Sequence, residues 1–190
     1  MPQTFLEEVL KGKDKKKTSL PIVFMGYYNP IFKFGEKNFI EKALEVGVDG
    51  LILADLPPEE AKDLLKISRE KEFSLIFLLT PVSSSSRIKL VCKVSDGFIY
   101  CVSYTGITGE KKEEKDCLVS LVKKVRLHTN LPLYVGFGIS SPHQAKDLSS
   151  LFDGVIVGSA VIRKIKEKRF DPGMVKKVGD FVSSLVQAVK

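Results

Sequence analysis

Short runs of consecutive apolar residues recur along the chain, and a stretch with helical periodicity follows each of them. Uninterrupted apolar runs of this length are typical of parallel strands that are buried on both faces. The predicted strands are residues 21–25, 50–54, 74–79, 97–102, 131–135 and 154–157. The predicted helices are residues 39–46, 59–70, 87–94, 117–128, 159–168 and 172–188. This alternation predicts a parallel α/β architecture, either an open doubly wound sheet or an eight-stranded barrel.

The last three predicted strands all lead into segments that contain glycine. These segments are SYTGITGE at 103–110, GFGISS at 136–141 and GSA at 158–160. In a parallel fold the C-terminal ends of the strands lie on one face, which is where active sites are built. Glycine lets backbone amides approach an anion, and a helix N-terminus adds partial positive charge. The pattern therefore predicts a phosphate site, with a helix beginning beside it at Ser140, Ser141 and Pro142.

Composition narrows the class of protein. With 190 residues, 44% of them hydrophobic and 28% charged, the chain is expected to form a single globular domain over 1–190. The three cysteines, Cys92, Cys101 and Cys117, lack CxxC spacing, which argues against a disulfide framework or a zinc site. No apolar run approaches the roughly 18 residues of a membrane span, and nothing resembles a signal peptide. A cytoplasmic protein with no membrane partner is expected.

The net charge of +7 raises the question of a nucleic-acid partner. The densest basic runs, at 11–17 and 163–169, are interrupted by acidic residues and contain no interleaved aromatic residues. Both runs are therefore interpreted as solvated surface, and no nucleic-acid partner is predicted. A basic surface would also attract a small phosphorylated substrate.

The segments GVDGLILADLPPEE, YTGITG, GFGISSP and VGSA, in this order, resemble the α subunit of tryptophan synthase. The resemblance runs from about residue 3 to the C-terminus. It implies a TIM (β/α)8-type barrel that cleaves indole-3-glycerol phosphate into indole and glyceraldehyde 3-phosphate in tryptophan biosynthesis. It also implies an α2β2 complex with a β subunit that carries the pyridoxal phosphate, so that this chain itself is expected to hold no cofactor and no metal.

The same resemblance assigns roles to individual positions. The backbone amides of four residues would bind the substrate phosphate: Gly109, Gly138, Gly158 and Ser159. Six side chains would line the indole pocket: Tyr27, Tyr100, Phe137, Met25, Ile52 and Ala54. Thr108 would close a loop over the site, although Tyr104 stands where the family usually has an arginine. From the residues alone, an inward-facing tyrosine or methionine on a barrel strand fits the core equally well.

The resemblance also points to a missing part. The family's catalytic glutamate and aspartate belong to its second strand and the loop after it, a segment with no counterpart here. A complete barrel needs about 250 residues, so the six predicted strands would be the third to the eighth, without the first strand, first helix and second strand. The chain is therefore expected to lack its catalytic carboxylates and to be inactive alone. Its outer strands, 21–25 and 154–157, are expected to have unpaired edges.

The remaining polar residues offer few substitutes for those carboxylates. Asp55 is the best placed acid, although capping a helix that begins near Pro57 is the simpler interpretation. Three other aspartates precede their strands and so lie on the opposite face: Asp49, Asp96 and Asp153. The two histidines, His128 and His143, are predicted to be exposed to solvent.

Two other functions compete with catalysis. The chain could be a non-catalytic subunit that binds and activates the β chain through Tyr28-Asn29-Pro30 and Pro57-Pro58. It could also be another phosphate-binding barrel enzyme, such as an isomerase or a flavin-dependent oxidoreductase. That last alternative does not explain why YTGITG and GFGISSP occur together.

Overall fold

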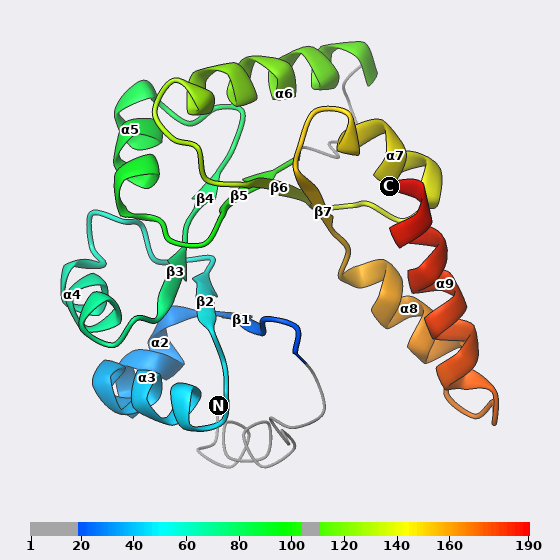
Figure 1. The fold of residues 1–190 in the computed structure, drawn as a ribbon, viewed down its shortest axis with the longest axis horizontal. Coiled ribbons are helices and arrows are strands. Elements are labelled where there is room, and N and C mark those ends of the chain that lie inside the picture. The colour runs from blue at the N-terminus through cyan, green and yellow to red at the C-terminus, as the bar shows by residue number, and fades with distance from the viewer. Residues whose placement is uncertain (1–18, 104–110) are drawn as a thin grey trace. The chain divides into compact units, whose positions relative to one another are not determined.

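A computed structural model describes residues 19–103 and 111–190 of the chain (Figure 1). Its strands are β1 (Val23–Gly26), β2 (Gly50–Leu53), β3 (Ser74–Ile76), β4 (Leu78–Leu79), β5 (Ile99–Val102), β6 (Leu133–Gly136) and β7 (Gly154–Ile156). Its helices are α2 (Tyr28–Phe34), α3 (Glu36–Glu45), α4 (Lys62–Glu70), α5 (Ser85–Val94), α6 (Lys111–Arg126), α7 (Pro142–Ser149), α8 (Ser159–Glu167) and α9 (Met174–Ala188). Strands and helices alternate as the apolar pattern predicts.

The strands form two sheets, with the orders β1-β2-β3 and β4-β5-β6-β7. Where the register is defined, neighbouring strands run parallel. Phe77 alone separates β3 from β4, so the predicted strand 74–79 is present but is interrupted at this residue. We count β3 and β4 together as one strand position. The described residues therefore supply six strand positions, in agreement with the sequence pattern.

The chain divides into two compact units. The first reaches to Leu78 and includes Leu90–Gly97, and the second comprises Leu79–Lys89 and Phe98–Lys190. Each unit has its own buried strands, β2 in the first and β5 with β6 in the second. The prediction of a single domain over 1–190 stays a prediction.

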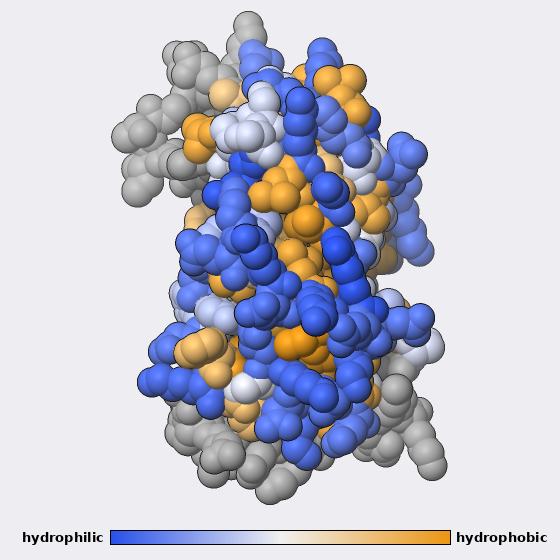
Figure 2. Space-filling view, turned by 90° about the vertical axis from the view of Figure 1, so that its left-hand side faces the viewer, coloured by the Kyte–Doolittle hydropathy of each residue, from blue (hydrophilic) through white to orange (hydrophobic). Residues whose placement is uncertain are grey.

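Amphipathic helices account for much of the buried surface. In α4, Leu64 and Leu65 are buried, and in α3 the buried residues are Phe39, Ile40 and Ala43. Apolar residues of these helices recur at the helical spacing, so each helix has one apolar side that packs inward. Figure 2 shows one face of the molecule, on which hydrophilic residues predominate and hydrophobic residues are visible between them.

Three aspartates lie at the N-terminal ends of strands and connect them to the preceding strand. The backbone N–H groups of Asp49, Asp96 and Asp153 donate to the carbonyls of Ile22, Leu75 and Leu133, at 2.8, 2.9 and 3.0 Å. The carboxylate of Asp49 also accepts from the Ile22 N–H at 2.7 Å. Each of these aspartates lies at the N-terminal end of its strand, whereas the glycine-containing segments follow C-terminal strand ends, and residues at N-terminal strand ends usually serve stability. The prediction that they precede their strands is confirmed.

Asp153 provides a pH-dependent contribution to stability. Its Oδ2 accepts from the Leu133 N–H at 2.7 Å and forms an ion pair with Arg126. The hydrogen bond from Leu133, assisted by Arg126, holds the pKa of the Asp153 carboxyl below its usual range. A depressed folded-state pKa gives stability that is fully present above the unfolded pKa, and that stability is lost as the pH falls through the folded pKa.

Replacing Asp153 with alanine is therefore expected to lower the free energy of unfolding by about 1 kcal/mol at pH 7. The effect should shrink as the pH falls below the ordinary pKa of an aspartate, and it should vanish once the pH has fallen through the depressed pKa of folded Asp153, because the wild-type carboxyl is then protonated. Urea unfolding of both proteins at pH 7 and at pH 3 measures this difference. A loss of equal size at both pH values would contradict a role for the ionised carboxylate.

Candidate functional site

The loops that follow β5 and β6 are joined by one buried serine. Ser103 follows β5 directly, and its backbone N–H donates to the Gly136 carbonyl at 2.9 Å. Its hydroxyl lies 3.1 Å from the same carbonyl and 2.9 Å from that of Phe137, to which it donates. Sequence reasoning did not select Ser103, because its partners lie more than 30 residues away along the chain.

Gly136 is required at the end of β6 because the Tyr100 ring occupies the adjacent space. A Cβ atom at position 136 would lie 2.4 Å from the Tyr100 hydroxyl oxygen and 2.7 Å from the nearest ring carbon. Tyr100 is only 5% exposed, and burial raises the pKa of its hydroxyl above the ordinary value. The second unit therefore brings Tyr100 and the GFG segment together.

The backbone turns sharply immediately after Gly136. Phe137 has φ = 98° and Gly138 has φ = 74°, so two successive residues have positive φ. This is unfavourable for a phenylalanine, and such strain is retained where the surroundings fix the conformation. The hydrogen bond from Ser103 to the Phe137 carbonyl is one such constraint. The Phe137 side chain itself is 63% exposed.

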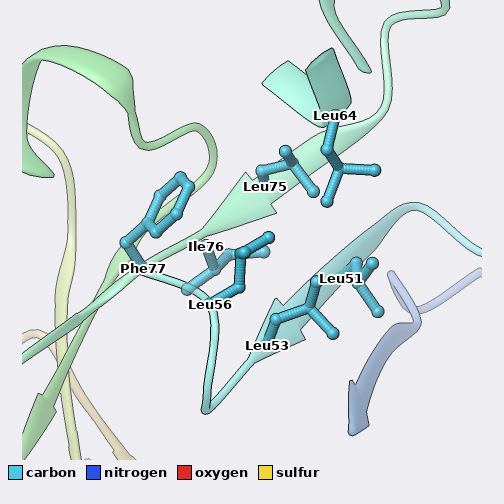
Figure 3. A pocket seen from close by; sticks show the side chains of 7 residues that line it. All are labelled: Leu51, Leu53, Leu56, Leu64, Leu75, Ile76 and Phe77. Carbon is cyan, nitrogen blue, oxygen red and sulfur yellow. The ribbon is translucent and has the colours of Figure 1, made fainter. Parts of the chain in front are cut away.

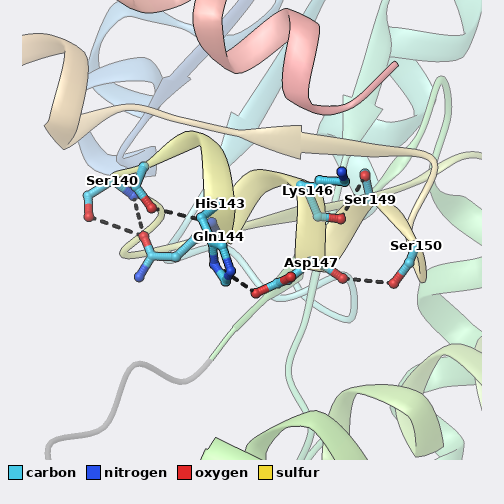
Figure 4. Close-up of polar contacts among 8 residues, drawn as sticks. Ser140, His143, Gln144, Lys146, Asp147, Ser149 and Ser150 are labelled. Carbon is cyan, nitrogen blue, oxygen red and sulfur yellow. Dashed lines mark hydrogen bonds and ion pairs between the residues drawn. The ribbon is translucent and has the colours of Figure 1, made fainter.

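The N-terminus of α7 is closed by its own side chains (Figure 4). The Ser141 hydroxyl accepts from the Gln144 N–H at 3.3 Å, and Pro142 occupies the first turn. The Gln144 side chain reaches back, where its Oε1 accepts from the Ser140 N–H at 2.9 Å. The predicted helix start at Ser140, Ser141 and Pro142 is confirmed. Because this N-terminus already has side-chain caps, it offers fewer donors to a ligand.

The N-terminus of α8 is different. Gly158 precedes the helix and has no side chain that could cap it, and the first turn contains no acidic residue. Both Gly158 and Ser159 are exposed, and a Cβ at Gly158 would meet nothing within 4 Å. The first amides of a helix lack intrahelical partners, and together with the helix dipole they attract an anion. This helix terminus is the best candidate for the predicted phosphate site.

Strand ends in the first unit carry the other predicted pocket residues. Met25 and Ile52 are partners in the register of β1 and β2, so their side chains lie on the same face of the sheet. The Ala54 N–H donates to the Gly26 carbonyl at 3.2 Å, next to this pair. Tyr27 precedes α2 and is 68% exposed. Within this unit the structure thus places Met25, Ile52 and Ala54 next to one another.

Asp55 has a different structural role from the one predicted. Its Oδ1 accepts from the Tyr28 N–H at 2.8 Å, and Tyr28 is the first residue of α2. The prediction that it caps a helix near Pro57 is wrong, because the following helix, α4, begins only at Lys62. Asp55 instead connects the loop after β2 to the helix after β1. The Tyr28 side chain is held as well, because its hydroxyl donates a hydrogen bond to Glu36 at 2.8 Å. Burial is the larger cause and this hydrogen bond the second cause that raise the pKa of the Tyr28 hydroxyl to about 12.

A small apolar cavity lies beneath β2 and β3 (Figure 3). It measures about 10 Å³, and its lining is entirely apolar: Leu51, Leu53, Leu56, Leu64, Leu75, Ile76 and Phe77. That volume is close to the minimum for a single water molecule. We interpret it as a packing defect of the first unit, since it is too small for any substrate.

Several other predictions can be compared with the structure. His128 and His143 are exposed, as predicted, and His143 lies 3.1 Å from Asp147. Cys92 and Cys101 are buried, whereas Cys117 is exposed. Across residues 19–103 and 111–190 no group of ligating side chains is arranged to hold a metal ion, and no helix could cross a membrane. Thr108 and Gly109 lie outside the described residues.

Comparison with known proteins identifies the family. The family model described as "Tryptophan synthase alpha chain" matches residues 1–190. The chain belongs to the tryptophan synthase alpha chain family. It is 47% identical over 180 residues to the alpha chain of Geobacter sp. (strain M21), covering 95% of this chain and 67% of the relative. It is also 44% identical over 176 residues to the alpha chain of Geotalea uraniireducens, covering 93% of this chain and 66% of that relative.

Solved structures of tryptophan synthase alpha chains share the fold. The alpha subunit of Campylobacter jejuni superposes with a TM-score of 0.84 at 36% identity, covering 92% of this chain and 70% of that one. A chain of the tryptophan synthase a2b2 complex of Pyrococcus furiosus superposes with a TM-score of 0.81 at 32% identity, covering 96% of this chain and 72% of that one. The predicted TIM-barrel-type fold is confirmed, with six strand positions in the described residues. The chain spans about two thirds of the length of the curated tryptophan synthase alpha chains that it matches.

Proposed function

We propose that this chain is a tryptophan synthase alpha chain that binds indole-3-glycerol phosphate, the substrate that is cleaved to indole and glyceraldehyde 3-phosphate. The observation that carries the proposal is the N-terminus of α8, where Gly158 leaves the first amides without a side-chain cap. The phosphate would accept hydrogen bonds from the amides of Gly158 and Ser159, with Gly138 contributing from the loop after β6. Gly109 is proposed as a further ligand from the family resemblance alone.

The indole ring would contact aromatic and aliphatic side chains at the strand ends. We assign this role to the six positions given by the resemblance: Tyr27, Tyr100, Phe137, Met25, Ile52 and Ala54. Tyr100 is supported by its position against Gly136, and Met25 with Ile52 by their shared register. Thr108 is proposed to close the loop after β5.

Cleavage requires a general acid to protonate C3 of the indole and a carboxylate that interacts with the indole nitrogen. Asp55 is a poor candidate for either role, because its Oδ1 accepts from the Tyr28 N–H and holds α2 in place. Asp49 and Asp153 lie at the opposite ends of their strands. We therefore propose that the 190-residue chain binds the substrate phosphate but does not turn the substrate over by itself.

The test is indole release from indole-3-glycerol phosphate by the purified chain, together with calorimetric binding of glycerol 3-phosphate. We expect saturable binding of glycerol 3-phosphate and no indole above the uncatalysed rate, with or without an added β subunit. Indole release at an enzymatic rate would show that a carboxylate of this chain performs the chemistry. Failure to bind glycerol 3-phosphate would refute the phosphate site itself.

A second candidate function is activation of the β subunit, the pyridoxal phosphate enzyme of the family. A match to a chain of an a2b2 complex favours it, as does the surface that follows β1 and β2 in the first unit. There Tyr27 and Phe32 are 68% and 63% exposed, and Asp55 fixes the start of α2 beside them. Addition of the chain should raise β-subunit turnover if this surface is competent. An unchanged rate at saturating chain concentration would exclude this function.

We propose the cytoplasm as the site of action.

A further inference from the structure

Ser103 continues the pairing of β5 with β6 by one residue beyond the two strands. The register of this parallel pair ends where Val102 faces Gly136. The strand geometry stops there, because the next residue, Phe137, has φ = 98° whereas β-strands have negative φ. Ser103 continues the connection, since its N–H donates to the Gly136 carbonyl and its hydroxyl donates to the Phe137 carbonyl, each at 2.9 Å.

The hydrogen bond to the Phe137 carbonyl fixes the orientation of a whole peptide group. The carbonyl of Phe137 and the N–H of Gly138 belong to the same planar group, and the described residues contain no cis peptide bond. In a trans peptide the C=O and the N–H point in opposite directions. Because the Phe137 carbonyl points toward the Ser103 hydroxyl, the Gly138 N–H points away from Ser103.

The Gly138 N–H is available as a hydrogen-bond donor. Gly138 is exposed, and within residues 19–103 and 111–190 its N–H forms no hydrogen bond. The Ser140 N–H in the same turn differs, because it donates to the Gln144 side chain at 2.9 Å. An exposed backbone donor without a protein partner can bind water or a ligand acceptor.

Gly138 occupies the same position after β6 as Gly158 does after β7. The register of these strands pairs Gly136 with Ile156, and each of the two glycines follows two residues later. Neighbouring parallel strands lie about 4.8 Å apart, so the two glycines belong to adjacent loops at the same end of the sheet. The Gly138 amide therefore lies in the loop next to the uncapped N-terminus of α8.

Glycine at position 138 leaves the orientation of this peptide group open. Gly138 has φ = 74° and no Cβ, so its own backbone can adopt this orientation or the opposite one. The Ser103 hydroxyl selects between them, because Ser103 is only 6% exposed and its hydroxyl has the Phe137 carbonyl as an acceptor. The hydrogen bond to this carbonyl also polarises the peptide group, which makes the Gly138 N–H a stronger donor.

We propose that Ser103 is a positioning residue for anion binding, which acts through the Phe137 carbonyl to direct the Gly138 N–H toward the substrate phosphate. Ser103 itself does not touch the ligand. The inference rests on the proposed function, because it specifies how one of the proposed phosphate ligands is oriented. It adds a side chain to a site that was otherwise assigned to backbone amides.

The test follows the amide signals of the whole chain, labelled with nitrogen-15 glycine, by NMR during titration with glycerol 3-phosphate. In the wild-type chain the signals of Gly138 and Gly158 should both shift and saturate together. In Ser103→Ala the affinity should fall about tenfold, the loss expected for one hydrogen bond to a charged group. The Gly138 signal should then lose most of its shift at saturation, whereas the Gly158 signal keeps it. A Gly138 signal that responds in Ser103→Ala as in the wild type would overturn the proposal.

Ser95→Ala is the matched control. Ser95 is a second buried serine, also 6% exposed, and its hydroxyl has no hydrogen-bond partner among the described residues. This substitution should leave the affinity for glycerol 3-phosphate within about twofold of wild type and the response of Gly138 intact. Equal losses in Ser95→Ala and Ser103→Ala would overturn the proposal, because removal of either buried hydroxyl would then have the same effect.

The unmodified chain separates this inference from the proposed function. If neither glycine signal responds to glycerol 3-phosphate, the phosphate site is refuted and this inference is refuted with it. If Gly158 responds and Gly138 does not, the phosphate site at α8 stands and only the role of Ser103 is overturned. This comparison needs no substitution, so it stays decisive if Ser103→Ala does not fold.

Discussion

Replacing Gly136 with alanine is expected to lower the free energy of unfolding by about 3 kcal/mol, the largest effect among the substitutions considered. The new Cβ would lie 2.4 Å from the Tyr100 hydroxyl oxygen and within 2.8 Å of two ring carbons. The Tyr100 ring is buried at the end of β5, so it has little room to move away without disturbing the core. Urea unfolding monitored by circular dichroism measures the loss.

Two further variants separate steric conflict from a general cost of replacing glycine. Gly158→Ala should change the free energy of unfolding by less than about 0.5 kcal/mol, because nothing lies within 4 Å of a Cβ there. Replacing Tyr100 with leucine in the Gly136→Ala background should recover part of the loss, so that the two substitutions are not additive. Gly136→Ala behaving like Gly158→Ala would show that the contact with Tyr100 is not what requires glycine.

Replacing Gly158 with aspartate is expected to weaken binding of glycerol 3-phosphate at least tenfold without lowering stability. A negative side chain at the start of α8 repels the phosphate and also occupies space that the glycine leaves open. The same charge interacts favourably with the helix dipole, so the free energy of unfolding should stay unchanged or rise by up to about 1 kcal/mol. Isothermal titration calorimetry and urea unfolding of one preparation give both values.

The control for charge is the same substitution at Gly179. That glycine is also exposed, and a Cβ there also meets nothing within 4 Å, but it lies within α9 rather than at a helix N-terminus. Gly179→Asp should leave the affinity for glycerol 3-phosphate within about twofold of wild type, because an exposed charge at a distance is screened by salt. An equal loss in both variants would mean that the phosphate responds to the overall charge of the chain and not to the α8 terminus.

The strands were predictable from the sequence because each is an uninterrupted apolar run. The apolar runs GLIL at β2 and IYCV at β5 are expected to be buried on both faces of a sheet, and both strands are buried almost completely. The start of α7 was also predictable, because its capping residues are neighbours in the sequence. Signals that lie within a few residues of one another thus identified the strands and one helix boundary.

Tertiary contacts explain what the sequence did not reveal. Helix α2 was not predicted, because it has only seven residues and an early proline, and its first amide is capped by Asp55 from 27 residues away. The role of Ser103 likewise depends on carbonyls that only the fold brings near. The glycine-rich segments predicted a phosphate site, and the family resemblance assigned Gly138 and Gly158 to it, but neither signal showed which helix terminus is uncapped.

The aspartates at the N-terminal ends of the strands have a consequence for how this fold can change. Asp49 and Asp153 each connect two neighbouring strands at the N-terminal ends of those strands, whereas Gly136 ends β6 and Gly158 follows the C-terminal end of β7. Mutations that alter ligand preference in the loops after the strands therefore leave the interactions at the N-terminal strand ends intact. Such a chain can acquire or lose a substrate through loop variation while the anchoring of its strands is inherited unchanged.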